Sequence, residues 1–213
     1  MPPTSVVLCM VTKNKAINTT TLHSAMNLNM LCMSNNINLE IHFVTDRSNL
    51  HKYIKSSSAE RLVWLDYGVS VDVETIKRLA VEDFPEGYKV LVAPCVVEGV
   101  DWELFKKKTL EGSTEPAHQR GLSFDTVTTP APKKFGDGLA DFVSSSSDCR
   151  VFSMECKAVL KKLRDADSQF KSFEHLKKMG VKIGVLRSCS VLCHYVYESV
   201  GNILDSSGVR TGP

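Results

Sequence analysis

The chain has 213 residues, of which 43% are hydrophobic and 23% are charged, a composition typical of one globular domain with a core of its own. Its formal net charge is only +2, so electrostatics give no reason to expect nucleic acid or an anionic membrane as the main partner. No apolar stretch is long enough to span a bilayer, and the first residues do not resemble a signal peptide. We therefore expect a cytoplasmic protein.

Apolar runs alternate with helical patterns in the first half of the chain. The runs predict strands over residues 5–11, 39–45, 61–65 and 88–93. Helices are predicted from about residue 18, over 50–56, from about 72 and over 101–110. In the first helix, apolar residues recur at helical spacing and therefore share one face: Leu22, Met26, Met30 and Met33.

The second half begins with a segment of weak periodicity. Residues 111–137 are rich in Gly, Pro, Ser and Thr, and we expect an irregular segment that acts as a mobile lid or acceptor loop. Further strands are predicted over 151–154 and 181–186, and helices over 156–163 and 170–179. We expect one domain over residues 1–204 and a disordered tail or linker over 205–213. The alternation of strands and helices predicts an α/β domain with a mainly parallel central sheet flanked by helices.

Polar clusters follow three of the predicted strands. They are Thr12-Lys13, Asp46-Arg47 and Asp66-Tyr67-Gly68. Because sheets of this kind bind ligands at the carboxyl ends of their strands, we expect these clusters to form a binding site. The chain has no G-x-G-x-x-G, no P-loop motif and no G-x-S-x-G, which argues against a dinucleotide-binding Rossmann domain, a P-loop NTPase and an α/β-hydrolase.

The segment from Arg61 to Ala80 is an apolar strand that ends in Asp66, followed by a short apolar turn and a helix. It resembles the D-x-D signature of glycosyltransferases with the GT-A fold, and the resemblance covers most of the chain. The whole chain also resembles the glycosyltransferase domain of chloroviruses, which acts on capsid-protein glycans. The resemblance implies a GT-A-like, Rossmann-like nucleotide-binding domain. Its activity would be transfer of a hexosyl or deoxyhexosyl group from a UDP- or dTDP-sugar to a glycan or glycoprotein.

The resemblance also implies a divalent metal, Mn²⁺ or Mg²⁺. Asp66 is the first expected metal ligand, and His194, which follows the last predicted strand, is the second. The chain departs from the family because Gly68 replaces the second acidic residue of D-x-D. Glycine there would let the backbone approach the donor sugar, and donor phosphates would complete the metal shell. The alternatives are that Asp66 only caps a turn and that His194 only bonds a carbonyl.

The donor nucleotide is expected to contact the residues that follow the strands. Thr12 and Lys13 are assigned to the base or the phosphates, and Asp46 with Arg47 to the base or the ribose. Arg61 is assigned to a phosphate, although a surface charge before a strand is an equal alternative. The full set of expected nucleotide-sugar contacts is Thr12, Lys13, Asp46, Arg47, Arg61, Asp66, Tyr67 and Gly68.

An inverting glycosyltransferase needs a carboxylate base beside the acceptor hydroxyl. Asp165 and Asp167 precede the helix that ends at Gly180 and loosely resemble the acidic pair that supplies this base in the family. A solvated helix end is the alternative interpretation of this pair. Two other functions remain open: a non-catalytic nucleotide- or carbohydrate-binding module with a degenerate D-x-D, and a sugar-nucleotide pyrophosphorylase, which would need a Gly-rich loop after the first strand.

Overall fold

The computed structural model describes residues 2–45, 47–48, 50–56, 58–97, 100–114, 117, 120–130, 138–145, 149–166 and 169–194. The strands are β1 (Ser5–Val11), β2 (Asn38–Val44), β3 (Arg61–Leu65), β4 (Val69–Val71), β5 (Val90–Ala93), β6 (Thr126–Pro130), β7 (Leu139–Ser145), β8 (Val151–Glu155), β9 (Ile183–Leu186) and β10 (Val191–Cys193). The helices are α1 (Thr19–Ser34), α2 (Leu50–Ser56), α3 (Val73–Ala80), α4 (Trp102–Leu110), α5 (Cys156–Asp165) and α6 (Phe173–Lys178). Within the described ranges, no helix combines the length and the apolar character that crossing a membrane requires.

Eight strands form one sheet, in the order β2-β1-β3-β8-β5-β9-β7-β6. The prediction of an α/β domain is confirmed, but the sheet is mixed rather than simply parallel. β8 lies antiparallel to both β3 and β5, and β7 lies antiparallel to both β9 and β6. The sequence pattern could not reveal this, because an apolar run looks the same in either strand direction.

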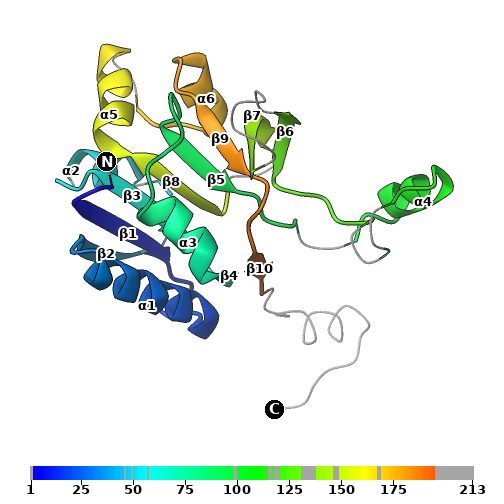
Figure 1. The fold of residues 1–213 in the computed structure, drawn as a ribbon, viewed down its shortest axis with the longest axis horizontal. Helices are drawn as coiled ribbons and strands as arrows, with labels where there is room; N and C mark the ends of the chain where they lie inside the picture. Colours follow the sequence, from blue (N-terminus) through cyan, green and yellow to red (C-terminus); the bar gives the residue numbers. More distant parts are fainter. Residues whose placement is uncertain are drawn as a thin grey trace.

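Helices cover both faces of the sheet (Figure 1). Alternate residues of β1 contribute to two separate apolar clusters, as strand geometry requires. Val6, Leu8 and Met10 pack in the cluster that includes side chains of α1 and α3. Val7, Cys9 and Val11 pack in the cluster that includes side chains of α2, α5 and α6. Helix α4 has no buried side chain and stands apart from this layered body.

Four strands lie where none was predicted: β4, β6, β7 and β10. β6 occupies part of the segment that was expected to be irregular, and β4 pairs with β10 in a separate two-stranded sheet. Strands of three residues give too short a pattern to be recognised in the sequence. The expected tail over residues 205–213 lies outside the described part of the chain.

Helix α1 presents an unexpected face to the sheet. Asn18 caps the helix by accepting from the backbone N–H groups of Thr20 and Thr21. The side chains that the helix buries are mostly small or polar: Thr21, Ser24, Ala25, Leu28 and Cys32. The apolar stripe identified by its spacing is exposed instead: Leu22 38%, Met26 59%, Met30 64% and Met33 70%.

Ser24 explains part of this polar inner face. Its hydroxyl oxygen is buried and accepts from the Val71 N–H at 2.9 Å, which fixes β4 against α1. We predict that Ser24→Ala lowers the free energy of unfolding by about 1–3 kcal/mol, because the buried Val71 N–H loses its acceptor. Urea denaturation measures the change.

Ser34→Ala in the same helix is the matched control. The Ser34 hydroxyl donates to the Met30 carbonyl at an exposed position, so its loss should change stability by no more than about 0.5 kcal/mol. Equal effects of the two substitutions would contradict the role of Ser24.

Candidate functional site

The strand ends that carry the predicted polar clusters meet at one edge of the sheet. β1, β2 and β3 are parallel neighbours, so the residues that follow them lie side by side. β8 runs the other way next to β3, and its first residue, Val151, pairs with Leu65, the last residue of β3. The residues just before β8 therefore reach the same edge as Asp66, which follows β3.

Asp66 lies between two arginines at this edge. Its Oδ2 is 3.8 Å from Nη2 of Arg47 and 3.7 Å from Nε of Arg150. Its Oδ1 accepts from the Tyr67 N–H at 2.8 Å. The side chains of the three charged residues are 14–28% exposed, so the cluster is partly shielded from water but open to a ligand.

Two aromatic rings contact the guanidinium group of Arg47. Its guanidinium carbon lies 5.5 Å from the ring centroids of both Trp64 and Phe152, whose rings are stacked on each other. It also donates to the Cys149 carbonyl. Cation–π contacts and this hydrogen bond fix the guanidinium beside Asp66. Asp46, predicted together with Arg47, lies outside the described residues.

Arg150 and Asp125 belong to the site although the sequence did not point to them. Arg150 donates to the Tyr67 carbonyl at 2.9 Å. Its backbone N–H donates to Oδ2 of Asp125 at 3.2 Å, and the Cys95 N–H donates to Oδ1 at 3.0 Å. Burial raises the pKa of Asp125, although these two backbone bonds and the nearby arginines oppose the rise. Asp125 thus connects the end of β5 to the start of β8.

His194 reaches the same region through the small two-stranded sheet. β10 pairs antiparallel with β4, and the His194 N–H donates to the Gly68 carbonyl at 2.6 Å. Gly68 has φ +74°, and a Cβ atom there would lie 2.5 Å from the His194 carbonyl oxygen. The glycine therefore admits the backbone of His194, a different reason from the close approach to a donor sugar that we predicted.

Thr12 and Lys13 also lie at this edge, directly after β1. The Thr12 N–H and hydroxyl both donate to the Val44 carbonyl, which ties the ends of β1 and β2 together. Lys13 exchanges two backbone hydrogen bonds with Ala16 across a tight turn and is exposed. Tyr67 is partly buried against the core cluster that contains Trp64.

Arg61 and Asp165 are not brought to this edge. Arg61 opens β3, so it lies about 16 Å along the strand from Asp66. It is 3% exposed, donates to the Glu82 carbonyl at 2.6 Å and stacks on Phe84. Asp165 is the exposed last residue of α5, which lies far from β4 and β10 in Figure 1. Asp167 lies outside the described residues.

One cavity lies at this edge of the sheet, and another lies away from it. One of about 630 Å³ lies at the ends of β5 and β9 and along β10, with a lining that includes Pro94, Phe124, Arg187 and Leu192. Its volume suits a small-molecule ligand. It therefore offers space for a small molecule beside the strand ends.

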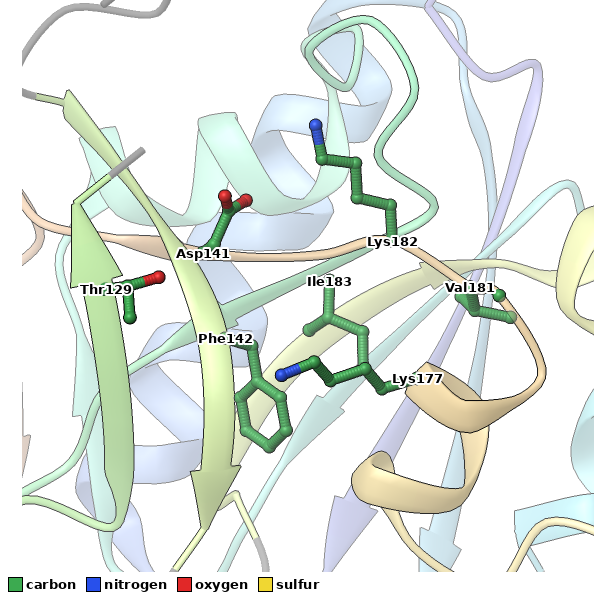
Figure 2. A pocket seen from close by; sticks show the side chains of 8 residues that line it. Thr129, Asp141, Phe142, Lys177, Val181, Lys182 and Ile183 are labelled. Atoms are coloured by element: carbon green, nitrogen blue, oxygen red, sulfur yellow. The ribbon is translucent and has the colours of Figure 1, made fainter. Parts of the chain in front are cut away.

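The other cavity, of about 420 Å³, lies beside the start of β9 (Figure 2). Its lining includes Asp141 of β7 and Lys182. Asp141 accepts from the Tyr88 hydroxyl, and Nζ of Lys182 lies 4.2 Å from the Tyr88 ring centroid. These polar groups already contact one another, so we do not assign a ligand to this cavity.

Few metal-binding donor atoms gather among the described residues at the strand ends. Within the described ranges, no three His, Cys, Asp or Glu side chains gather in a way that would hold a metal ion. Asp66 and His194 supply one carboxylate and one imidazole, both suitable for Mn²⁺. The structure links the two residues through the backbone bond from His194 to Gly68, and a metal shared by their side chains, with further oxygens from a ligand, stays a prediction.

The comparisons with known proteins identify no family. No protein-family model and no curated protein matches the sequence. Among solved structures, the chain is similar to the crystal structure of GalNAc-T7 with UDP, GalNAc and Mn²⁺, with 14% identity and a TM-score of 0.49. The match covers 92% of this chain and 44% of that chain, so the chain spans less than half the length of that protein. A likeness this distant carries no information on activity.

We predict that Gly68→Ala destabilises the protein more than Gly112→Ala does. Both glycines have positive φ, +74° and +69°, but only Gly68 faces a close atom, and a Cβ at Gly112 would meet nothing within 4 Å. Gly112→Ala should cost about 1 kcal/mol from backbone strain. Gly68→Ala should cost about 2–4 kcal/mol, because the clash with His194 is added.

Urea denaturation of the two variants measures the difference. Equal losses would contradict the close backbone contact between Gly68 and His194.

Proposed function

We propose that the chain is a metal-assisted glycosyltransferase that transfers a sugar from a UDP- or dTDP-type donor to a glycan or glycoprotein acceptor. The observation that carries the proposal is the position of Asp66. It ends a buried strand at the carboxyl edge of the sheet, where two arginines flank it. The pairing of β10 with β4 brings the His194 backbone next to Gly68, which follows Asp66 by two residues.

The two arginines suit a diphosphate. Their contacts with Asp66 are 3.7 and 3.8 Å, longer than hydrogen bonds, so charge attraction rather than directed bonding holds them there. A diphosphate placed beside Asp66 would meet two guanidinium groups, which bind phosphate oxygens well. As charge develops on the leaving diphosphate, Arg47 and Arg150 would stabilise it.

The remaining donor contacts follow from the strand ends. We assign the phosphates or the base to Thr12 and Lys13, and the base or ribose to Asp46. Tyr67 and Gly68 would lie near the donor sugar because they follow Asp66 directly. Arg61 is left out of the proposed site, because it is buried at the other end of β3.

Asp66 and His194 are the residues that would hold Mn²⁺ or Mg²⁺. A bound divalent ion would supply positive charge to the leaving diphosphate. In support of this assignment, the Tyr67 N–H orients the Asp66 carboxylate, and the backbone bond to Gly68 sets the position of the His194 main chain. Both positions are set by backbone pairing rather than by long flexible side chains.

The acceptor is assigned to the cavity of about 630 Å³ at the ends of β5 and β9. Its mixture of apolar surface, from Phe124 and Leu192, and a cation, from Arg187, suits a sugar ring with polar substituents. A role for Asp165 or Asp167 as catalytic base stays a prediction. Action on capsid glycoproteins of a chlorovirus, in the host cytoplasm, is the narrowest form of the proposal and rests on sequence resemblance alone.

The alternative is a non-catalytic module that binds a nucleotide or a carbohydrate. Gly68 removes the second carboxylate of D-x-D, and the arginines beside Asp66 lower its affinity for a cation. Such a module would bind nucleotide without needing metal and would neither transfer nor hydrolyse the sugar. Release of UDP or dTDP from a sugar donor, followed over time, distinguishes the two functions.

We predict that a UDP- or dTDP-type nucleotide stabilises the protein only weakly alone and more strongly with Mn²⁺. At about a hundred times the dissociation constant, the gain should be roughly 2.7 kcal/mol. Asp66→Asn should remove the part that depends on Mn²⁺, because the metal loses its carboxylate. Thermal unfolding with UDP, dTDP, GDP and ADP, each with and without Mn²⁺, measures these gains.

Asp165→Asn is the matched control, because the same change is made at an exposed helix end far from Asp66. It should bind nucleotide like the unmodified chain. The absence of a shift with every nucleotide would exclude donor binding. A shift that Asp66→Asn leaves intact would favour the non-catalytic module.

A separate prediction concerns Arg150. Arg150→Gln should weaken nucleotide binding about tenfold even without Mn²⁺, a loss of about 1.4 kcal/mol, because a cation facing the diphosphate is removed. Isothermal titration in metal-free buffer measures this loss. Arg187→Gln, a change outside the Asp66 cluster, should leave metal-free nucleotide affinity unchanged. Identical losses in the two variants would mean that only general charge attracts the nucleotide.

A further inference from the structure

The surface formed by α1 and β2 is unusually apolar for an exposed region. Four side chains along α1 are 38–70% exposed: Leu22, Met26, Met30 and Met33. In β2, Ile41 is 39% and Phe43 is 56% exposed. Exposed apolar side chains that gather on one part of a protein surface often mark an interaction site.

The β2 side chains lie on the same face of the sheet as α1. Parallel pairing sets Leu39, Ile41 and Phe43 beside Val6, Leu8 and Met10 of β1. Those three β1 residues pack in the cluster that contains the buried side of α1. Ile41 and Phe43 are therefore on the side of the sheet that α1 covers.

The exposed stripe of α1 faces away from the centre of the sheet. Ser24 binds Val71 of β4 and so marks the inner flank of the helix. Leu22, Met26 and Met33 lie roughly 160–180° around the helix axis from Ser24. They thus lie on the flank directed away from β4, on the face of the sheet that also carries the exposed Ile41 and Phe43.

The outer edge of β2 is open to another strand. β2 ends the sheet, and no other strand in the described ranges pairs with its outer side. The Asn38 N–H and the Val44 carbonyl bond towards β1. Because backbone groups alternate along a strand, the N–H and C=O groups of Leu39, Ile41 and Phe43 point outwards.

The other edge strand, β6, is protected against pairing with a strand of another chain, whereas β2 is not. Edge strand β6 ends in Pro130, and its register shifts between Val127 and Thr128. Proline and bulges are devices that prevent edge-to-edge pairing. β2, with the sequence NLEIHFV, has no proline, no lysine and a regular register with β1 over all seven residues.

We propose that β2 and the exposed flank of α1 form the interface of a homodimer. Two copies of β2 pair antiparallel across a two-fold axis at Ile41, so that the two sheets join into one. Leu39 of each copy then lies opposite Phe43 of the other. The outward backbone groups of both strands face each other in this register and satisfy one another.

Charge selects this register over its neighbours. On the other face of β2, Nε2 of His42 lies 2.8 Å from Oε1 of Glu40 within one copy. With Ile41 on the axis, Glu40 of each copy lies opposite His42 of the other. A shift that keeps the backbone groups matched would set either two Glu40 or two His42 side chains against each other, which is unfavourable.

The helices fit the same arrangement. α1 packs on both β1 and β2, and adjacent strands are about 4.8 Å apart. Two copies of α1 lying over their own β1–β2 pairs would therefore be about 10 Å apart, the spacing of packed helices. The exposed methionines of the two copies would then bury one another, which suits their flexible and adaptable side chains.

Sedimentation of the full chain under reducing conditions tests the interface. We expect a reversible dimer with a dissociation constant of about 10 µM or lower. Phe43→Lys and Met26→Lys, one change on the strand and one on the helix, should each weaken it at least tenfold, because a lysine enters an apolar contact. Val127→Lys is the matched control, since Val127 is 50% exposed on the opposite edge strand and should leave the dimer intact.

A monomer at ~100 µM of the unmodified chain overturns the proposal, and so does a dimer that survives both lysine substitutions. Circular dichroism and thermal unfolding of each variant confirm that it is folded before its sedimentation is interpreted.

A charge exchange tests the register. Glu40→Lys alone sets a cation opposite His42, and His42→Glu alone sets two carboxylates together, so each variant should dimerise at least tenfold more weakly. When the two variants are mixed, each introduced charge meets an opposite charge, and a heterodimer should form. Native mass spectrometry counts the heterodimer, and its absence from the mixture would overturn the proposed pairing.

Discussion

The antiparallel insertion of β8 between β3 and β5 is the constraint on which the site depends. Because β8 starts where β3 ends, it delivers Arg150 to Asp66 and the Cys149 carbonyl to Arg47. It also places the Arg150 N–H on Asp125, which holds the end of β5 through the Cys95 N–H. Had β8 run parallel to β3, its last residue rather than its first would lie beside Asp66, and none of these contacts would form.

The charge contacts around Asp66 are weaker than the hydrogen bonds that hold the two arginines. Ion pairs at 3.7–3.8 Å between groups that are 14–28% exposed fall between weak surface pairs and costly buried ones. The firm contacts of the two arginines are instead to carbonyl oxygens, those of Tyr67 and Cys149. These backbone contacts hold both guanidinium groups independently of Asp66.

The sequence could predict the residues that follow strands but not those that tertiary structure brings to them. Asp66 and Arg47 were found because a polar residue after a buried run marks a strand end. Arg150 precedes an apolar run. The edge of the sheet at which it lies therefore depends on the direction of β8, which apolar periodicity does not encode. Arg61 was assigned to a phosphate although it opens the predicted strand, and it lies at the opposite edge because β3 runs parallel to β1. In α1 the regular spacing of the methionines was real, but the helix buries its other face.

The inverted face of α1 and the position of His194 have a common cause in β4. This three-residue strand is too short to be stable alone, and it is fixed on one side by Ser24 of α1 and on the other by β10. The inner face of α1 places one small polar side chain, Ser24, against this buried N–H, while the long apolar side chains of its stripe lie outside. Within the described ranges, β10 pairs with β4 alone. The position of His194 beside Gly68 therefore depends on the contact that holds β4 to α1. The composition of the inner face of α1 is therefore linked to the geometry of the site at the strand ends.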